Sequence, residues 1–206
     1  MARYTGPKNR LARREGVDLG MKTVGSHAHA QLLRRLNIVP GQHGVKGKRK
    51  ISDYGVQLRE KQKVKRMYGM LERQFRKIFA KAKKFRGNTG EQFIQFLETR
   101  LDNTLFRMGL SPTRACARQL VSHRHVTVNG KTVATPSFEV EKDQVISLSG
   151  KGMEVPGVKK MLDEKNIQLP GWVERKGPVG KVVRLPMRTD VTDDINEQLI
   201  IEFYSR

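Results

Sequence analysis

Five polar side chains on two predicted helices are the residues of this chain best suited to recognise a ligand. Arg100, Asn103 and Arg107 recur at spacings of three and four, which places them on one face of the first helix. Arg114 and Arg118, four residues apart, share a face of the second helix. A guanidinium group presents a planar fork of N–H donors that matches the oxygens of a phosphate. The pattern therefore predicts a rigid surface that binds phosphates, with these side chains pointing outward.

The first of these helices is predicted from an apolar pattern. Leu97, Leu101, Leu105 and Met108 recur at spacings of four, four and three, so their side chains form one apolar side. Gly109 follows them and is expected to end the helix, because glycine accepts a positive φ without steric cost. The arginines fall on a different side of the helix, which we expect to face solvent.

The second helix is predicted from its cap and its apolar residues. Ser111 can accept a hydrogen bond at the N-cap, and Pro112 suits the first helical position, where its missing N–H is harmless. Ala117, Leu120 and Val121 can then face a core.

A small antiparallel sheet is expected to support the two helices. Residues 125–128 alternate like a strand, and Asn129-Gly130 is a strong two-residue hairpin turn. Residues 145–148 and 179–185 are short stretches rich in branched apolar residues and are expected to form further strands. Helices and hairpin together predict an α/β module that presents basic side chains.

His123 and Arg124 lie directly before the hairpin, and we predict that both contact RNA. The run His123-Arg124-His125 is also compatible with acid–base catalysis. No serine nucleophile with a paired acid stands in a recognisable arrangement, so the sequence does not predict an enzyme. No cofactor is predicted.

Residues 51–86 are predicted to form one long helix. Its apolar seam comprises Val64, Tyr68, Leu71, Phe75, Ile78 and Ala82. Its other sides carry the predicted RNA-binding residues Arg59, Lys63, Arg66, Arg73 and Lys77. A single seam needs a packing partner.

The expected partners of that seam are a helix at 91–97 and the C-terminal segment. Ile195, Leu199 and Phe203 recur at intervals of four, which predicts a helix. Thr192 and Asp193 offer a cap and early negative charge. The apolar run that begins at Leu199 leaves a strand as the alternative.

Residues 1–50 are predicted to be an extended basic arm that folds on its partner, with only residues 30–36 helical. The arm closes with four predicted RNA-binding residues: Lys46, Lys48, Arg49 and Lys50.

Charge is distributed unevenly along the chain. The net charge is +21, and residues 1–90 hold 24 basic and 5 acidic residues. A polyanion relieves the self-repulsion of such a segment and gains free energy from counterion release. The charge therefore favours a nucleic-acid partner. No apolar run approaches a membrane span, and no secretory signal is visible, so no membrane partner is predicted.

Four stretches carry a family resemblance. They are PGQHG at 40–44, SDYGVQLREKQKVKRMYGMLERQFRKIF at 52–79, RLDNTLFRMGLSPTRACARQLVSHRHVTVNG at 100–130 and INEQLIIEFYSR at 195–206. Together they resemble the bacterial-type small-subunit ribosomal protein S-four family over essentially the whole chain. The third stretch alone is less specific, because several protein families contain that RNA-binding module.

The resemblance implies an α+β fold with a divided helical domain. Its parts would be the basic arm at 1–50, a helical domain at 51–90 that is completed by 181–206, and an inserted α/β RNA-binding module at 91–180. Many relatives bind zinc through four cysteines in the arm. The matching region here has none, so a zinc-free variant is expected.

The resemblance also implies a function. The family binds the 5′ domain of small-subunit ribosomal RNA early in assembly, lies near the messenger RNA entry channel, touches ribosomal protein S-five and affects decoding accuracy. The expected location is the cytoplasmic ribosome, with an organellar ribosome as the alternative. Two other functions are alternatives for a chain with this module: an RNA-modifying enzyme such as a pseudouridine synthase, and a ribosome-associated stress or rescue factor.

Overall fold

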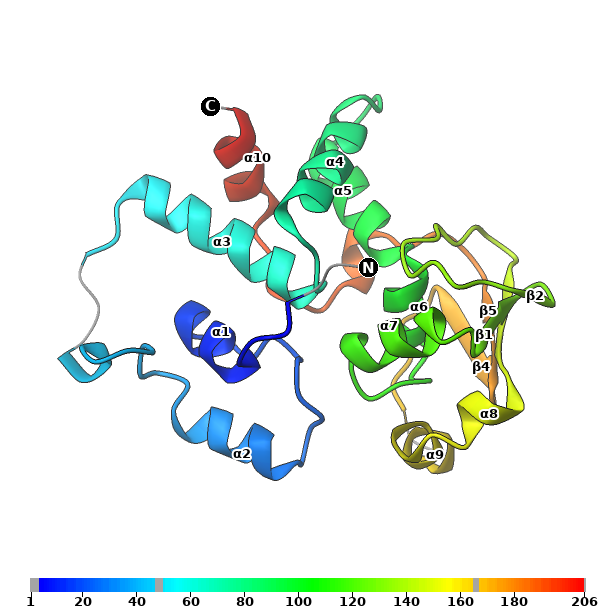
Figure 1. The fold of residues 1–206 in the computed structure, drawn as a ribbon. Helices are drawn as coiled ribbons and strands as arrows, with labels where there is room; N and C mark the ends of the chain where they lie inside the picture. Colours follow the sequence, from blue (N-terminus) through cyan, green and yellow to red (C-terminus); the bar gives the residue numbers. More distant parts are fainter. Residues whose placement is uncertain (1–3, 47–49, 165–166, 206) are drawn as a thin grey trace. The chain divides into compact units, whose positions relative to one another are not determined.

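A computed structural model describes residues 4–46, 50–164 and 167–205 of the chain (Figure 1). The fold is mixed α and β, as predicted, with helices and one five-stranded antiparallel sheet. The chain divides into two compact units. The first unit contains residues 1–90 and 194–206, and the second contains residues 91–193. The C-terminal residues thus return to the N-terminal unit, and the second unit is inserted between its parts.

The first unit is helical. Its elements are α1 (Lys8–Glu15), α2 (His27–Arg34), the short 3-10 helix η1 (Gly44–Lys46), α3 (Asp53–Met67), α4 (Glu72–Lys83) and α10 (Glu197–Ser205). Helix α1 contacts both α2 and α3, and α10 packs against α3.

The prediction of an extended arm is wrong for much of residues 1–50. Helix α1 buries Ala12, and α2 buries His29 and Leu32. Local signals stabilise α2: Ser26 caps it by accepting a hydrogen bond from the His29 amide, and Asp18 pairs with the His29 ring at 2.7 Å. The sequence did not predict α1, which has only two apolar residues, Leu11 and Ala12, and it placed the start of α2 too late.

The predicted long helix is two helices. It is interrupted at Gly69, whose φ of +62° is left-handed, and α4 begins only after Leu71. The apolar seam continues across this break, because Val64 and Tyr68 before it and Phe75 after it are all buried. The spacing therefore identified the buried residues but missed the turn between them.

Helix α10 completes the first unit, as predicted, and the strand alternative is wrong. Gln57 of α3 donates to Glu202 at 2.9 Å, and the ring of Tyr204 stacks on Phe79 with a centroid distance of 4.7 Å. The predicted caps are wrong. Asn196, at the position before the helix, accepts from the Leu199 amide instead.

The second unit combines short helices with the sheet. Its helices are α5 (Thr89–Glu98), which starts in the first unit, α6 (Leu101–Arg107), α7 (Arg114–Ser122), α8 (Gly150–Met153), α9 (Pro156–Asp163) and the 3-10 helix η2 (Arg188–Asp190). Its strands are β1 (Val126–Val128), β2 (Lys131–Thr132), β3 (Val145–Leu148), β4 (Val173–Lys176) and β5 (Val179–Val182), in the order β2-β1-β3-β5-β4. All paired strands are antiparallel, and β5 crosses the boundary predicted at residue 180.

The pattern at Leu97–Met108 also spans two helices. The chain leaves α5 at Thr99 and enters α6 after Arg100, which has extended backbone angles and forms a β-bridge with Glu139. The Leu101 amide donates to the carbonyl of Phe138 at 2.8 Å. This pairing with a distant segment explains a break that no local signal marked.

The later local signals gave mixed results. Gly109 follows α6 with a φ of +65°, as predicted. The cap of α7 is Thr113, two residues later than the predicted Ser111, and its side chain accepts from the Cys116 amide. Asn129 and Gly130 form the predicted turn, both with positive φ.

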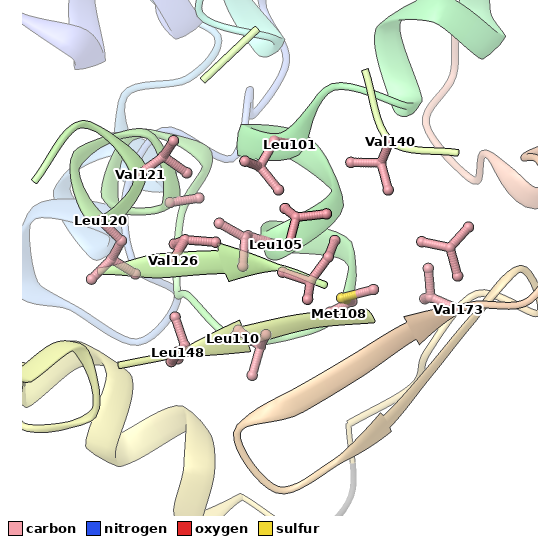
Figure 2. Packing of buried hydrophobic residues seen from close by; sticks show 14 of the residues in the cluster. Leu101, Leu105, Met108, Leu110, Leu120, Val121, Val126, Val140, Leu148 and Val173 are labelled. Carbon is pink, nitrogen blue, oxygen red and sulfur yellow. The ribbon is translucent and has the colours of Figure 1, made fainter. Parts of the chain in front are cut away.

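One apolar core joins the helices of the second unit to its sheet. Figure 2 shows Leu101 and Leu105 of α6 beside Leu120 and Val121 of α7, above Val126 of β1. Trp172, at the start of the last hairpin, is also buried in this cluster. The core holds α6 and α7 firmly against the sheet, so polar side chains on these helices have fixed positions.

Candidate nucleic-acid interface

The arginines expected on the surface of α6 and α7 are held inside the second unit. Arg100 donates two hydrogen bonds to Asp102, at 3.1 and 2.8 Å, and Arg118 donates to the same carboxylate at 3.4 Å. All three side chains are at least nine-tenths buried. Asp102 therefore balances two guanidinium groups that the helical spacing had assigned to solvent.

A second cluster continues this interior. Arg107 donates to both oxygens of Glu98 and to Asp193, at 2.7–2.9 Å. Arg114 donates to the same Asp193 at 3.2 Å and to Asn103 at 2.7 Å. Burial raises the pKa of Asp193, but the two guanidinium groups outweigh it and lower the pKa overall.

The prediction that these side chains point outward is therefore wrong. Helical spacing alone could not show that three acids pair with these arginines: Glu98 at the end of α5, Asp102 on the first turn of α6, and Asp193 far along the chain. Whether any of the five side chains contacts RNA stays a prediction. Their observed contacts hold α5, α6 and α7 and residue 193 together.

The predicted basic residues of α3 also have acidic partners. Arg59 and Arg66 both donate to Glu15 of α1, Arg59 at 3.2 Å. Lys63 pairs with Glu60 at 2.9 Å. Their charges are partly compensated inside the first unit, so α3 is not an uncompensated basic surface.

Helix α4 carries a group of exposed positive charges. Arg73 and Lys77, both predicted, are exposed, and three further exposed cations that the analysis of the sequence did not select share their side of the helix: Arg76, Lys83 and Lys84. We call these five residues the α4 basic face. In the described part of the chain none of the five forms an ion pair. The helix buries Phe75, Phe79 and Ala82 on its opposite side, so the face is rigidly presented.

The signal for the missed residues was in the sequence. Lys83, Lys84 and Arg86 surround Phe85 in a dense basic run after the last apolar seam residue, and Arg86 is exposed as well. This run lies beyond the seam, so the spacing of the seam residues does not identify it.

The remaining predicted contacts are scattered. Lys46 and Lys50 are exposed, whereas Lys48 and Arg49 lie outside the described residues. His123 and Arg124 are exposed at the end of α7, and Arg124 has a φ of +62°. This left-handed turn aims the chain from α7 into β1 and leaves both side chains at the surface.

Among the residues that the structure describes, no three His, Cys, Asp or Glu side chains gather as a metal site would require. In the same residues no helix is long and apolar enough to cross a membrane.

Comparisons with known proteins identify the family. Residues 3–98 match the description "Ribosomal protein S4/S9 N-terminal domain", and residues 99–146 match "S4 domain". The chain is 49% identical to the small ribosomal subunit protein uS4 of Neisseria meningitidis and of Neisseria gonorrhoeae, over the full length of both chains. It is 48% identical to uS4 of Laribacter hongkongensis, again over both whole chains. The chain belongs to the uS4 family.

Membership of the uS4 family confirms the resemblance seen in the sequence. The chain is a protein of the small ribosomal subunit, and in bacteria that location is cytoplasmic. The uS4 relatives are named as ribosomal proteins and not as enzymes, in agreement with the prediction that the chain is no enzyme. The S4 domain match begins at Thr99, near the start of the second unit, and covers α6, α7, β1, β2 and the first half of β3.

Proposed function

We propose that the chain binds the 5′ domain of small-subunit ribosomal RNA early in assembly and nucleates folding of the subunit body. The observation that carries this proposal is the α4 basic face. Five cations project from one side of a helix whose other side is locked into a core, and no described acid compensates them. Such a surface suits the phosphates of structured RNA, because it offers charge without a base-stacking aromatic row.

Two finer roles are part of the same proposal. The chain would contribute to the messenger RNA entry channel and to translational accuracy, and it would contact ribosomal protein S-five. These roles rest on membership of the uS4 family and on the resemblance of the motifs. The exposed His123 and Arg124 are candidates for further RNA contacts in the second unit.

The experiment that tests RNA binding is a salt titration of affinity for a 5′-domain transcript. If roughly 6–10 phosphates are contacted, affinity should fall roughly 10³–10⁵-fold between about 50 and 200 mM salt. The double variant Arg73→Gln/Lys77→Gln should bind more weakly. The slope of log K against log salt should fall by about one for each phosphate that the variant no longer binds.

The matched control removes the same charge from another exposed helix. Lys159→Gln/Lys160→Gln, on α9 of the second unit, should leave slope and affinity close to those of the unchanged chain. A nearly flat salt plot, or an equal loss in both double variants, would contradict the assignment to the α4 basic face.

A second measurement separates a structural ribosomal role from a stress or rescue role. A structural protein should remain on small subunits at one copy per particle after sedimentation at high salt. Loss to well below one copy per particle would favour the rescue factor.

A further inference from the structure

Four arginines line one pocket in the first unit. Arg10 and Arg14 come from α1, and Arg59 and Arg66 come from α3; Tyr4, Leu11 and Pro40 complete the lining. The pocket has a volume of about 310 Å³. It lies on the α1–α3 contact and is separate from the α4 basic face, none of whose residues lines it.

A buried glutamate fixes two of these arginines. The side chain of Glu15 is 1% exposed, and its Oε1 accepts hydrogen bonds from both Arg59 and Arg66. Its Oε2 is buried and has no hydrogen-bond partner in the described part of the chain. Because Glu15 anchors both guanidinium groups from the α1 side, their positions are set before any ligand arrives.

The charge of the pocket is not balanced. Only Arg59 and Arg66 pair with Glu15, and Arg10 and Arg14 have no ion-pair partner in the part of the chain that the structure describes. Loss of solvation lowers the pKa of Arg66, and the like charges of Arg59 and Arg14 add to this effect. An anion in the pocket would relieve that repulsion.

We propose that this pocket binds a phosphodiester group of RNA together with its adjoining ribose. The ligand is an oxyanion, because guanidinium groups match phosphate oxygens with pairs of parallel N–H donors. A volume of about 310 Å³ exceeds what one phosphate fills and lies at the lower end of small-molecule sites, which suits a sugar–phosphate unit. The inference rests on the proposed function and adds a specific phosphate site to it.

The test is phosphate-ethylation interference on the 5′-domain transcript, with the full-length chain. The variant Arg10→Gln/Arg14→Gln removes the two unpaired guanidinium groups and leaves the Glu15 pairs intact. The unchanged chain should show interference at a set of phosphates, and the variant should lose interference at one site, or two adjacent sites, in that set. Its slope of log K against log salt should fall by about one for each phosphate that it no longer binds.

The matched control is Arg34→Gln/Arg35→Gln. These two arginines follow one another at the end of α2, are exposed, and lie in the same unit. The control should keep every interference site. If the unchanged chain, the pocket variant and the control show the same interference sites, the pocket does not hold an RNA phosphate, although the chain does bind RNA. If the unchanged chain does not bind the transcript, the proposed function and the pocket assignment both fall.

A thermal melt with inorganic phosphate distinguishes free anion from RNA. At matched ionic strength, millimolar phosphate should raise the melting temperature of the unchanged chain by no more than it raises that of Arg10→Gln/Arg14→Gln. The RNA proposal would be overturned if phosphate raised the melting temperature of the unchanged chain but not that of the variant, while the variant kept every interference site. The pocket would then be assigned to a free phosphate.

Discussion

Helix α4 and the α6–α7 pair contain similar basic residues at similar spacings, yet the charges of α4 are exposed whereas those of α6 and α7 are paired with acids. On α4, the five residues of the α4 basic face are exposed and form no ion pair among the described residues. On α6 and α7, Arg107, Arg114 and Arg118 are held by carboxylates, and the last two are buried.

The difference comes from the acids around each helix. The sequence of α4 contains a single acid, Glu72, and that carboxylate is occupied by Lys61 and Lys65 of α3 and by the Tyr204 hydroxyl. Helices α6 and α7 are surrounded by Glu98, Asp102 and Asp193. A basic stripe is therefore available to RNA only where the fold brings no carboxylates to it, and charge counting along one helix does not reveal this.

The largest effect is expected from Asp102→Ala. This change leaves Arg100 and Arg118 buried without their carboxylate, and breaking a buried pair from one side costs about 3–5 kcal/mol of unfolding free energy. Urea denaturation followed by Trp172 fluorescence reports the second unit directly. Asp163→Ala, an exposed acid at the end of α9, is the control and should change stability by less than about 0.5 kcal/mol. Equal losses of unfolding free energy in Asp102→Ala and Asp163→Ala would mean that the buried ion pairs stabilise the unit no more than an exposed acid does.

Arg118→Ala and Lys77→Ala should separate stability from RNA binding. Arg118→Ala should cost about 1–3 kcal/mol, less than the loss of Asp102, because Asp102 keeps its bonds to Arg100. Lys77→Ala should leave the melting temperature unchanged and weaken RNA binding. Thermal melts and transcript affinities of both variants check this. A stable Arg118→Ala protein with weak RNA binding would restore the outward-facing prediction.

Asp193→Ala should destabilise the second unit by about 1–2 kcal/mol, since Arg107 and Arg114 keep Glu98 and Asn103 as partners. The neighbouring Asp194 offers a natural control, because its side chain is fully exposed whereas that of Asp193 is 26% exposed. Asp194→Ala should have no measurable effect on urea denaturation. Equal free energies of unfolding for the Asp193→Ala and Asp194→Ala variants would contradict this prediction.

The smallest effect is expected from pH. Burial raises the pKa of Glu72, but hydrogen bonds from Lys61, Lys65 and Tyr204 outweigh it and lower the pKa to about 2 from an ordinary value of 4.5. The folded state therefore holds this carboxylate ionised, so its stabilising contribution is present above about pH 4.5 and is lost as the pH falls toward about 2. Glu72→Gln should be less stable than the unchanged chain at neutral pH, and thermal melts should show the difference narrowing in acid. A difference that stays constant with pH would exclude this linkage.

The sequence predicted apolar contacts better than polar ones. The seam through Val64 and Phe75 and the apolar side through Leu101 and Leu105 are buried as expected, because periodicity depends only on neighbouring residues. The breaks at Gly69 and Arg100 were missed. The second depends on pairing with Glu139, which is distant in the sequence and has no local signal.

The same limit explains the errors in the candidate site. Thr192 and Asp193 were predicted to offer a cap and early negative charge to the last helix, but Asp193 accepts hydrogen bonds from Arg107 and Arg114 instead. Glu15 lies 44 and 51 residues from the arginines of α3 that it anchors. Ion-pair partners are chosen by tertiary structure, so the sequence could name the basic residues but not say which of them remain uncompensated.

The division of the first unit has a consequence for the order of events during synthesis. Ribosomes make the chain from the N-terminus, and domains fold as units when their parts are available. The second unit has all its residues once residue 193 has emerged, whereas Gln57, Glu72 and Phe79 wait for α10, which supplies Glu202 and Tyr204. The α4 basic face therefore gains its full support only when the last helix has been made, so that a nascent, unfinished chain holds α4 less firmly than a finished one.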